Sequence, residues 1–252
     1  MVKAVDGPYS YDTTRPNGPR SWSSVDEEFS ACGAGEIQSP INFPAAVGAS
    51  PLADGPQPKL VRANYTLGSG SWNWALACHE ERACGYTMFA GKKWYVIQTH
   101  FHHPSEHTLM EKRFPLESHT VHQSEDGNLA VIATVFDYPP EADYPSTIKA
   151  AHNMDYGVNP YLKEVLEGIT QDKGTFEIDP MAIIDPSQGF CSYTGSLTTP
   201  PCTEGVTFLM QMNIATVSRR QVHDYALSAG MPRKKIHSLC DFYVSQASAS
   251  SV

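Results

Sequence analysis

Six of the ten histidines of this 252-residue chain fall between positions 100 and 122. In the segment 96–102 the residues alternate as they do in a β-strand, so Gln98, His100 and His102 share one face while Phe101 points to the other. Two imidazole rings therefore converge on one side of a predicted strand. His-x-His spacing alone is more often structural than metal-binding, so the surrounding residues must decide between the two.

The segment 117–122 can return as a neighbouring strand, with Glu117 and His119 on the face that carries His100 and His102. Three protein nitrogens with one open position are typical of a catalytic zinc site, whereas structural zinc sites are closed by four protein ligands. A metal-bound histidine usually donates its second ring nitrogen to an amide or a carboxylate. Gln98 and Glu117 stand in register to accept such bonds. Alternation places His103 and His122 on the opposite face, where we expect structural roles.

The elements that must position these side chains are short strands. Nineteen prolines and eighteen glycines divide the chain into brief runs rich in aromatic and β-branched residues, which favours strands joined by turns. The predicted strands span residues 59–67, 71–78, 93–102, 118–123, 129–136 and 206–213. Helices are predicted at 161–168 and 218–229, with Ser218 at the N-cap and Gly230 at the end of the second. We therefore expect a mainly β (α+β) fold on a large, mostly antiparallel twisted sheet with short peripheral helices.

Length and charge limit the classes of function. The 252 residues, 41% of them hydrophobic, suit a single domain over residues 1–252 with flexible ends at 1–10 and 245–252. A net charge of −9 and the lack of an extended Lys/Arg cluster argue against nucleic acid as a partner. No apolar run approaches the ~20 residues that span a bilayer, and residues 1–12 lack the apolar core of a signal peptide. We expect a mature form without a membrane span or a signal peptide.

The cysteines indicate the redox compartment. Their number is even, and none has the Cys-x-x-Cys spacing of a zinc ribbon. Six free thiols in a cytosolic protein are the alternative, but the even count favours disulfides. We therefore expect a secreted protein or one from another oxidising compartment, such as the periplasm, the extracellular space or an organelle lumen.

Three separated motifs carry the chemistry-bearing residues: QTHFHHPSEHT (98–108), ESHTVH (117–122) and YTGSLTTPPCTEGVTF (193–208). Two further motifs are QSPINF (38–43) and LAVIATVF (129–136). In their order and spacing these motifs resemble the α-class carbonic anhydrases, and the resemblance runs from about Tyr11 to about Asn213. It implies reversible hydration of carbon dioxide to bicarbonate and a proton by a zinc-bound hydroxide. It also implies CO2, water and bicarbonate as the small-molecule partners, with sulfonamides or anions as inhibitors.

The resemblance implies a role for each matched residue. His100 and His102 bind Zn2+ through one ring nitrogen, and His119 binds it through the other. Thr198 accepts a hydrogen bond from the zinc hydroxide and donates one to Glu106, because an ionised carboxylate can only accept. The residues matched behind the ligands are Gln98, Glu117, His107 and Tyr193. The residues matched to the substrate pocket are Val121, Val131, Leu197, Thr199, Val206 and Phe208, the last in place of a usual tryptophan.

The resemblance to extracellular relatives pairs Cys32 with Cys202, next to the loop that carries the matched threonine. Cys78 and Cys84 are near enough in sequence to close a hairpin. That leaves the last two cysteines as the third pair, Cys191 and Cys240.

Two departures from the family pattern affect the functional prediction. Gly70 stands where active relatives often carry a proton-shuttle histidine, so no shuttle is evident. From about Arg219 onward the chain lacks the usual ending of the family. The main alternative is therefore a catalytically silent relative that serves as a binding or matrix module, although the three histidines, Glu106 and Thr198 favour the enzyme. A structural zinc domain or another zinc hydrolase would need a fourth protein ligand or an HExxH helix, and neither is found.

Overall fold

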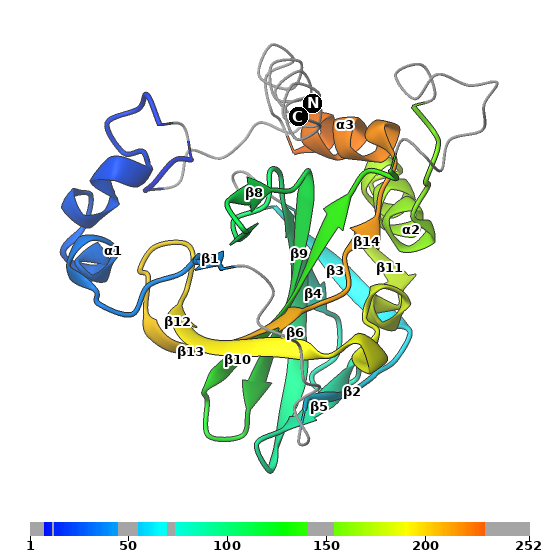
Figure 1. Cartoon of the computed structure of the whole chain (residues 1–252), viewed down its shortest axis with the longest axis horizontal. Coiled ribbons are helices and arrows are strands. Elements are labelled where there is room, and N and C mark those ends of the chain that lie inside the picture. Colours follow the sequence, from blue (N-terminus) through cyan, green and yellow to red (C-terminus); the bar gives the residue numbers. More distant parts are fainter. Residues whose placement is uncertain (1–7, 12, 45–54, 70–73, 141–153, 230–252) are drawn as a thin grey trace.

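The computed structural model describes residues 8–11, 13–44, 55–69, 74–140 and 154–229 (Figure 1). The strands of its large sheet are β2 (Gln57–Leu60), β3 (Ala63–Ser69), β4 (Trp74–Cys78), β5 (Gly85–Phe89), β6 (Lys92–His102), β9 (Leu116–Ser124), β10 (Leu129–Asp137), β11 (Thr175–Ile178), β12 (Phe190–Ser196), β13 (Glu204–Gln211) and β14 (Ala215–Thr216). A small sheet contains β1 (Asn42–Phe43), β7 (Thr108–Leu109) and β8 (Lys112–Arg113). The α-helices are α1 (Ala31–Ala34), α2 (Pro160–Thr170) and α3 (Arg219–Ser228). Short 3-10 helices are η1 (Pro19–Ser24), η2 (Glu27–Phe29), η5 (Pro180–Ile183) and η6 (Pro186–Gln188).

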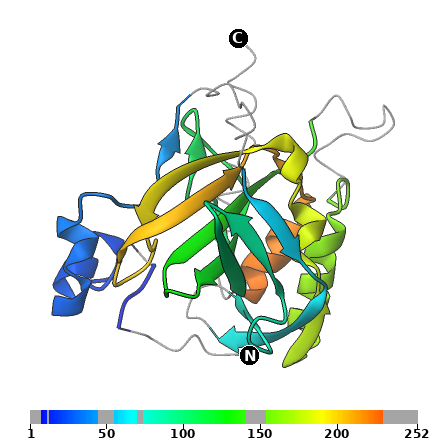
Figure 2. The same ribbon diagram turned by 90° about the horizontal axis from the view of Figure 1, so that it is seen from below.

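The strands of the large sheet follow the order β11-β3-β4-β6-β9-β10-β13-β12, with β2, β5 and β14 paired outside that path. Neighbouring strands are antiparallel except that β10 runs parallel to β13 and to β14. Helices α2 and α3 lie along one side of the sheet, and α1 lies on the opposite side of the molecule (Figures 1 and 2). The expected mainly β fold on a large, mostly antiparallel twisted sheet is confirmed.

Most of the predicted strands appear within a few residues of their expected ends, but the segment predicted as one strand over 59–67 is two. The strand β2 ends at Leu60 and pairs with β5, whereas β3 begins at Ala63 and pairs with β4 and β11. The chain changes partners at the exposed residues Val61 and Arg62. Periodicity along one segment carries no signal for such a change of partner.

The two longest helices begin with side-chain caps. Ser218 accepts a hydrogen bond from the backbone of Gln221, whose side chain accepts one from the backbone of Ser218, which completes a capping box. The predicted N-cap of this helix is confirmed, and Gly230 lies outside the described residues. In α2, Asn159 caps the helix and Pro160 occupies its first turn, where a missing amide hydrogen costs nothing. Within the described ranges, no helix is long and apolar enough to cross a bilayer.

The large sheet has two faces of different chemistry, which we call the back face and the front face. On the back face, Phe101, Leu116 and Ile132 belong to an apolar cluster that also includes side chains of α2 and α3. On the front face, His100 lies opposite His119 across β6 and β9. A second apolar cluster covers the part of the front face beyond β9, and its strand residues include Val121, Val131, Val206 and Phe208.

A β-bulge in β6 sets which residues face the front. Val96 pairs with His122 and Gln98 pairs with Val121, which leaves Ile97 as an extra residue without a cross-strand partner. As a result Val96 lies in the back cluster, although uninterrupted alternation from position 96 would place it beside Gln98 on the front. Ile97 is 37% exposed. The prediction of a common face for Gln98, His100 and His102 holds because all three follow the bulge.

Two disulfides join the cysteines that the sequence paired first. Cys32 is bonded to Cys202 and Cys78 to Cys84. The first links α1 to the loop between β12 and β13, and the second closes the turn between β4 and β5. Cys191 is half-buried on β12 and is in no disulfide with another described cysteine, so its expected bond to Cys240 stays a prediction. Cys240 lies outside the described residues.

Candidate metal centre

Three histidines from two adjacent strands meet on the front face. His100 and His102 come from β6 and His119 from β9. One ring nitrogen from each lies within 4.8 Å of the corresponding nitrogens of the other two. The ring centroids are 4.8 Å apart for His100 and His102, 5.2 Å for His100 and His119, and 4.6 Å for His102 and His119. The structure therefore brings together the three imidazoles that the sequence singled out, in an arrangement that could hold a metal ion.

Hydrogen bonds on the outer side of the rings fix which nitrogen each ring presents to the centre. Nδ1 of His100 lies 2.9 Å from Oε1 of Gln98, and Nε2 of His119 lies 2.8 Å from Oε1 of Glu117. Because both partners offer only a lone pair at these oxygens, the histidines donate there. Nε2 of His100 and Nδ1 of His119 are then left with lone pairs for a cation. Nε2 of His102 is buried and has no hydrogen-bond partner among the residues that the structure describes.

Burial keeps these rings in the form that binds metals. Burial lowers the pKa of His100 to about 3, with a further contribution from His119. The pKa of His102 is held well below its usual value, again first by burial and then by the neighbouring histidines. An imidazole that resists protonation keeps its ring lone pair. Both rings therefore offer a neutral nitrogen ligand at physiological pH.

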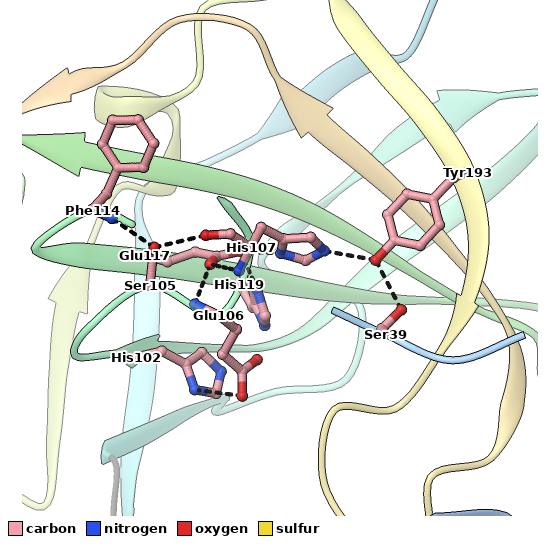
Figure 3. A network of polar contacts seen from close by, with 9 residues as sticks. All are labelled: Ser39, His102, Ser105, Glu106, His107, Phe114, Glu117, His119 and Tyr193. Atoms are coloured by element: carbon pink, nitrogen blue, oxygen red, sulfur yellow. Dashed lines mark hydrogen bonds and ion pairs between the residues drawn. The ribbon is translucent and has the colours of Figure 1, made fainter. Parts of the chain in front are cut away.

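Glu117 is the centre of the network behind the metal ligands (Figure 3). Its side chain is fully buried and accepts from the backbone N–H groups of Glu106 at 2.8 Å and His107 at 2.9 Å, and from Nδ1 of His107 at 2.6 Å, in addition to the bond from His119. Burial alone would raise the pKa of Glu117, but the two histidines outweigh it and hold the pKa well below the usual value. This carboxylate therefore stays ionised and orients His119.

The network continues from His107 to the neighbouring strand and the N-terminal region. Nε2 of His107 lies 2.6 Å from the hydroxyl oxygen of Tyr193. The hydroxyl oxygen of Ser39 lies 2.8 Å from the same Tyr193 oxygen. Burial raises the pKa of Tyr193, which keeps its phenol protonated. The ring of Phe208 stacks on Tyr193 at 5.1 Å.

Glu106 lies beside the metal ligands. Its Oε1 is 3.3 Å from Nδ1 of His102. Burial and the nearby Glu117 raise the pKa of Glu106 well above its usual value, whereas a hydrogen bond from the side chain of Thr198 and the charge of Arg113 lower it. The structure thus brings Thr198 and Glu106 together as the sequence predicted.

The apolar residues predicted near the site form one continuous surface on β9, β10, β13 and the loop between β12 and β13. Val121, Val131, Val206 and Phe208 are buried in the front cluster, and Leu197 packs against it partly buried. Thr199 is half-buried, and its carbonyl accepts from the backbone of Cys202 at 2.8 Å. The five apolar pocket residues therefore lie together, and Phe208 also contacts His107 and His119 with ring centroids 5.2 Å and 5.8 Å apart.

The remaining histidines of the motifs lie apart from the three-histidine cluster. Nδ1 of His103 donates to the carbonyl of Pro115 at 2.6 Å. His122 lies on the back face, where Nδ1 donates to the carbonyl of Thr120 and Nε2 is 3.0 Å from the hydroxyl of Thr87. These three contacts are of the structural kind expected for the two histidines. Gly70, the matched shuttle position, lies outside the described residues.

Three serines support the site without having been singled out from the sequence. Ser105 donates to the carbonyl of His107 at 2.7 Å and accepts from the backbone of Phe114 at 2.9 Å, which braces the loop that carries Glu106. Ser39 and Ser196 exchange bonds, since the backbone of each donates to the other's hydroxyl. Each serine lies inside one of the sequence motifs, so the motifs indicated the segments that form the site. The hydrogen-bond partners of the serines could be identified only from the fold.

A mainly β protein with a largely buried three-histidine centre is the class that this fold and site define. The chain belongs to the eukaryotic-type carbonic anhydrases, whose family model matches residues 17–238. Alpha carbonic anhydrase 8 of Arabidopsis thaliana is 30% identical over 238 residues, which cover 91% of this chain and 58% of that protein's length. Dioscorin dioA3 of Dioscorea japonica is 29% identical over 234 residues, covering 86% of this chain and 76% of that protein. The α-carbonic anhydrase of Thermovibrio ammonificans, solved with the inhibitor sulfanilamide, has a TM-score of 0.73 at 27% identity, covering 88% of this chain and 91% of that one.

Proposed function

We propose that this protein is an active carbonic anhydrase that hydrates carbon dioxide reversibly with the help of one zinc ion. The observation that carries the proposal is the set of three imidazoles, two buried and one half-buried, whose inner nitrogens lie together while the outer nitrogens of His100 and His119 are hydrogen-bonded. Three histidine nitrogens with no fourth protein ligand among the described residues suit a zinc site that keeps one position open for chemistry. The orphaned Nε2 of His102, buried away from water, supports the same assignment because an unpartnered buried nitrogen is costly without a ligand.

The chain would hold the ion through Nε2 of His100, Nε2 of His102 and Nδ1 of His119. A bound zinc ion lowers the pKa of a water molecule and so supplies a nucleophile near neutral pH, an effect for which carbonic anhydrase is itself the standard example. Gln98 and Glu117 hold two of the rings in the required tautomer. Their loss would weaken the site without removing a ligand.

Thr198 and Glu106 would aim the nucleophile. An ionised Glu106 can only accept, so the Thr198 hydroxyl must donate to it and can only accept from the attacking water. This fixes the direction in which the water presents its remaining lone pair. The positive charge of the metal would counter the burial that raises the pKa of Glu106.

Carbon dioxide has no strong hydrogen-bonding group, so an apolar surface beside the nucleophile is sufficient to receive it. Val121, Val131, Leu197 and Val206 offer such a surface. Thr199 would contact bicarbonate or an inhibitor, and sulfonamides are expected to bind here. Two disulfides fit an oxidising compartment, and we place the protein in a secreted or lumenal location.

A catalytically silent binding or matrix module is the alternative function. It is disfavoured because a silent module has no use for an intact ligand set braced by a fully buried carboxylate. A buried ionised network is costly to maintain and is most readily explained by the chemistry it positions.

The decisive experiment measures CO2 hydration by stopped flow together with zinc content. We expect about one zinc ion per chain and activity that a chelator removes. His119→Ala should lose both zinc and hydration while the protein stays folded. His79→Ala is the matched control, because His79 is exposed and bonds to Thr66. Near-normal hydration by the His119→Ala variant would overturn the ligand assignment.

Proton transfer gives a second test of the same proposal. Release of a proton from an acid of pKa near 7 to bare water is limited to on the order of 10³ s⁻¹. With Gly70 at the matched shuttle position, kcat should rise with the concentration of an imidazole buffer while kcat/KM stays unchanged. Gly70→His should reduce this dependence. A high kcat that is independent of buffer in the unmodified protein would show that an internal shuttle exists.

A further inference from the structure

The triplet Asn64-Tyr65-Thr66 is the one Asn-x-Ser/Thr sequence of the chain, with a residue other than proline in the middle. Such a triplet is the acceptor for N-linked glycans in proteins that pass through the secretory route. The triplet lies within β3 and has no part in the metal centre. Its value as a modification site depends on where the asparagine side chain points.

The register of β3 turns Asn64 outward. Tyr65 is fully buried in the back cluster, so its neighbour Asn64 points to the other side of the strand. Asn64 is exposed, and so is Glu177, its cross-strand partner on β11. The backbone carbonyl of Asn64 accepts from His79, but within the described part of the chain its side-chain amide takes part in no hydrogen bond. A group attached to the amide nitrogen would meet solvent and would displace no contact.

The position is far enough from the metal centre to leave it undisturbed. Gly68 of β3 pairs with Ala75 of β4, which pairs with His100. Asn64 lies four residues from Gly68, or about 13 Å along the strand, and β3 is two strand spacings, or about 10 Å, from β6. A glycan there would extend over the outer end of β3 and over β11, the last strand in the order of the sheet. Edge strands need such cover because their unpaired groups can recruit other chains.

The disulfides place the chain where the modification takes place. The bonds Cys32–Cys202 and Cys78–Cys84 form in oxidising compartments, and in eukaryotic cells that environment includes the lumen in which N-glycans are transferred. Cys78 pairs with Tyr65 across β3 and β4, so a stable disulfide and the acceptor triplet lie side by side.

We propose that Asn64 carries an N-linked glycan that covers the β3–β11 end of the sheet. The donor is an oligosaccharide linked to a polyprenyl diphosphate. A bond forms between Nδ2 of Asn64 and C1 of the first sugar, while the bond from C1 to the diphosphate oxygen breaks. The amide nitrogen loses one proton and the lipid diphosphate leaves, so nothing is oxidised or reduced.

The test expresses the full chain behind a secretion signal in a eukaryotic cell and maps Asn64 by mass spectrometry before and after peptide N-glycosidase treatment. The unmodified protein and Thr66→Ser, which keeps the acceptor triplet, should carry the glycan. Asn64→Gln and Thr66→Ala should not. Chains retained inside the cell are analysed as well, because transfer precedes folding and a secretion defect then cannot hide the result.

Removal of the glycan from the folded protein should leave zinc content within twofold and increase self-association. A bare Asn64 in chains that carry the Cys78–Cys84 disulfide would overturn the proposal. Glycan on Thr66→Ala at the level of Thr66→Ser would also overturn it, because the triplet would then not be the acceptor. A glycan whose removal leaves self-association unchanged would overturn the covering of the β11 edge.

Discussion

The front and back faces of the large sheet are built from the same strands, yet the side chains of the two faces have different roles. The back face of β6 and β9 contributes Phe101 and Leu116 to an apolar cluster closed by α2 and α3. The front face of the same two strands carries three histidines and a fully buried carboxylate. Side chains that alternate along a strand allow one element to be both scaffold and site. Substitutions at neighbouring residues of one strand should therefore change stability and chemistry separately.

The largest effect on stability should come from the back face. Phe101 is fully buried, and Tyr225 donates to its carbonyl at 2.6 Å. Phe101→Ala should lower the free energy of unfolding by about 3–5 kcal/mol because a cavity opens under α2 and α3. His100→Ala, a change at the neighbouring residue, should abolish zinc binding with a smaller loss of stability in the metal-free protein. Urea unfolding and zinc content are measured for both variants. Equal destabilisation of the two would contradict the separation of stability and chemistry between the two faces.

A pH dependence should distinguish a buried back-face histidine. Burial lowers the pKa of His122 from 6.5 to about 4, against hydrogen bonds that raise it. The unfolded chain therefore takes up a proton between pH 6.5 and 4 while the folded chain does not, so stability falls as the pH falls through this range. The difference corresponds to about 3 kcal/mol. In the metal-free protein, the unfolding free energy of His122→Gln should depend less steeply on pH, with a slope that corresponds to up to one proton fewer taken up on unfolding. An unchanged slope would contradict the assignment of this pH dependence to His122.

A smaller effect, confined to the front face, should follow from loss of an outer hydrogen bond. Gln98→Ala removes the acceptor of His100 Nδ1 and should weaken zinc binding by about 10- to 100-fold. Gln123→Ala is the matched control, since that glutamine is exposed and its side-chain amide donates to the carbonyl of Gly127, away from the histidines. Competition with a chelator of known affinity measures both variants. Equal affinities would show that the amide does not orient the ring.

The smallest effect should come from an unpartnered hydroxyl on the back face. Ser118 is buried and its hydroxyl makes no hydrogen bond within the described residues. Ser118→Ala should therefore change the free energy of unfolding by less than about 1 kcal/mol, with stabilisation as the expected sign. Ser105→Ala removes a hydroxyl that bonds to His107 and Phe114 and should cost about 1–3 kcal/mol. Thermal unfolding of the pair compares them, and an equal loss would mean that Ser118 has a partner.

The sequence predicted the histidine face of β6, its return on β9 and the capped start of α3, because each depends on local alternation or on a local cap. It did not predict the division between β2 and β3, since strand pairing joins residues far apart in the chain. It also did not reveal Ser39 as the partner of Tyr193, which is 154 residues away.

The extra residue Ile97 divides β6 into two halves, and side chains alternate regularly between the two faces within each half. Counting by twos from Trp94 leads to Val96 and the back cluster, whereas counting by twos from Gln98 leads to the histidines. Loss of Ile97 would remove the bulge and leave both halves of the strand on their present faces, because Val96 and Gln98 pair with the consecutive residues His122 and Val121 of β9. The bulge therefore lets β6 hold one residue more than the facing stretch of β9 without moving the histidines off the front face.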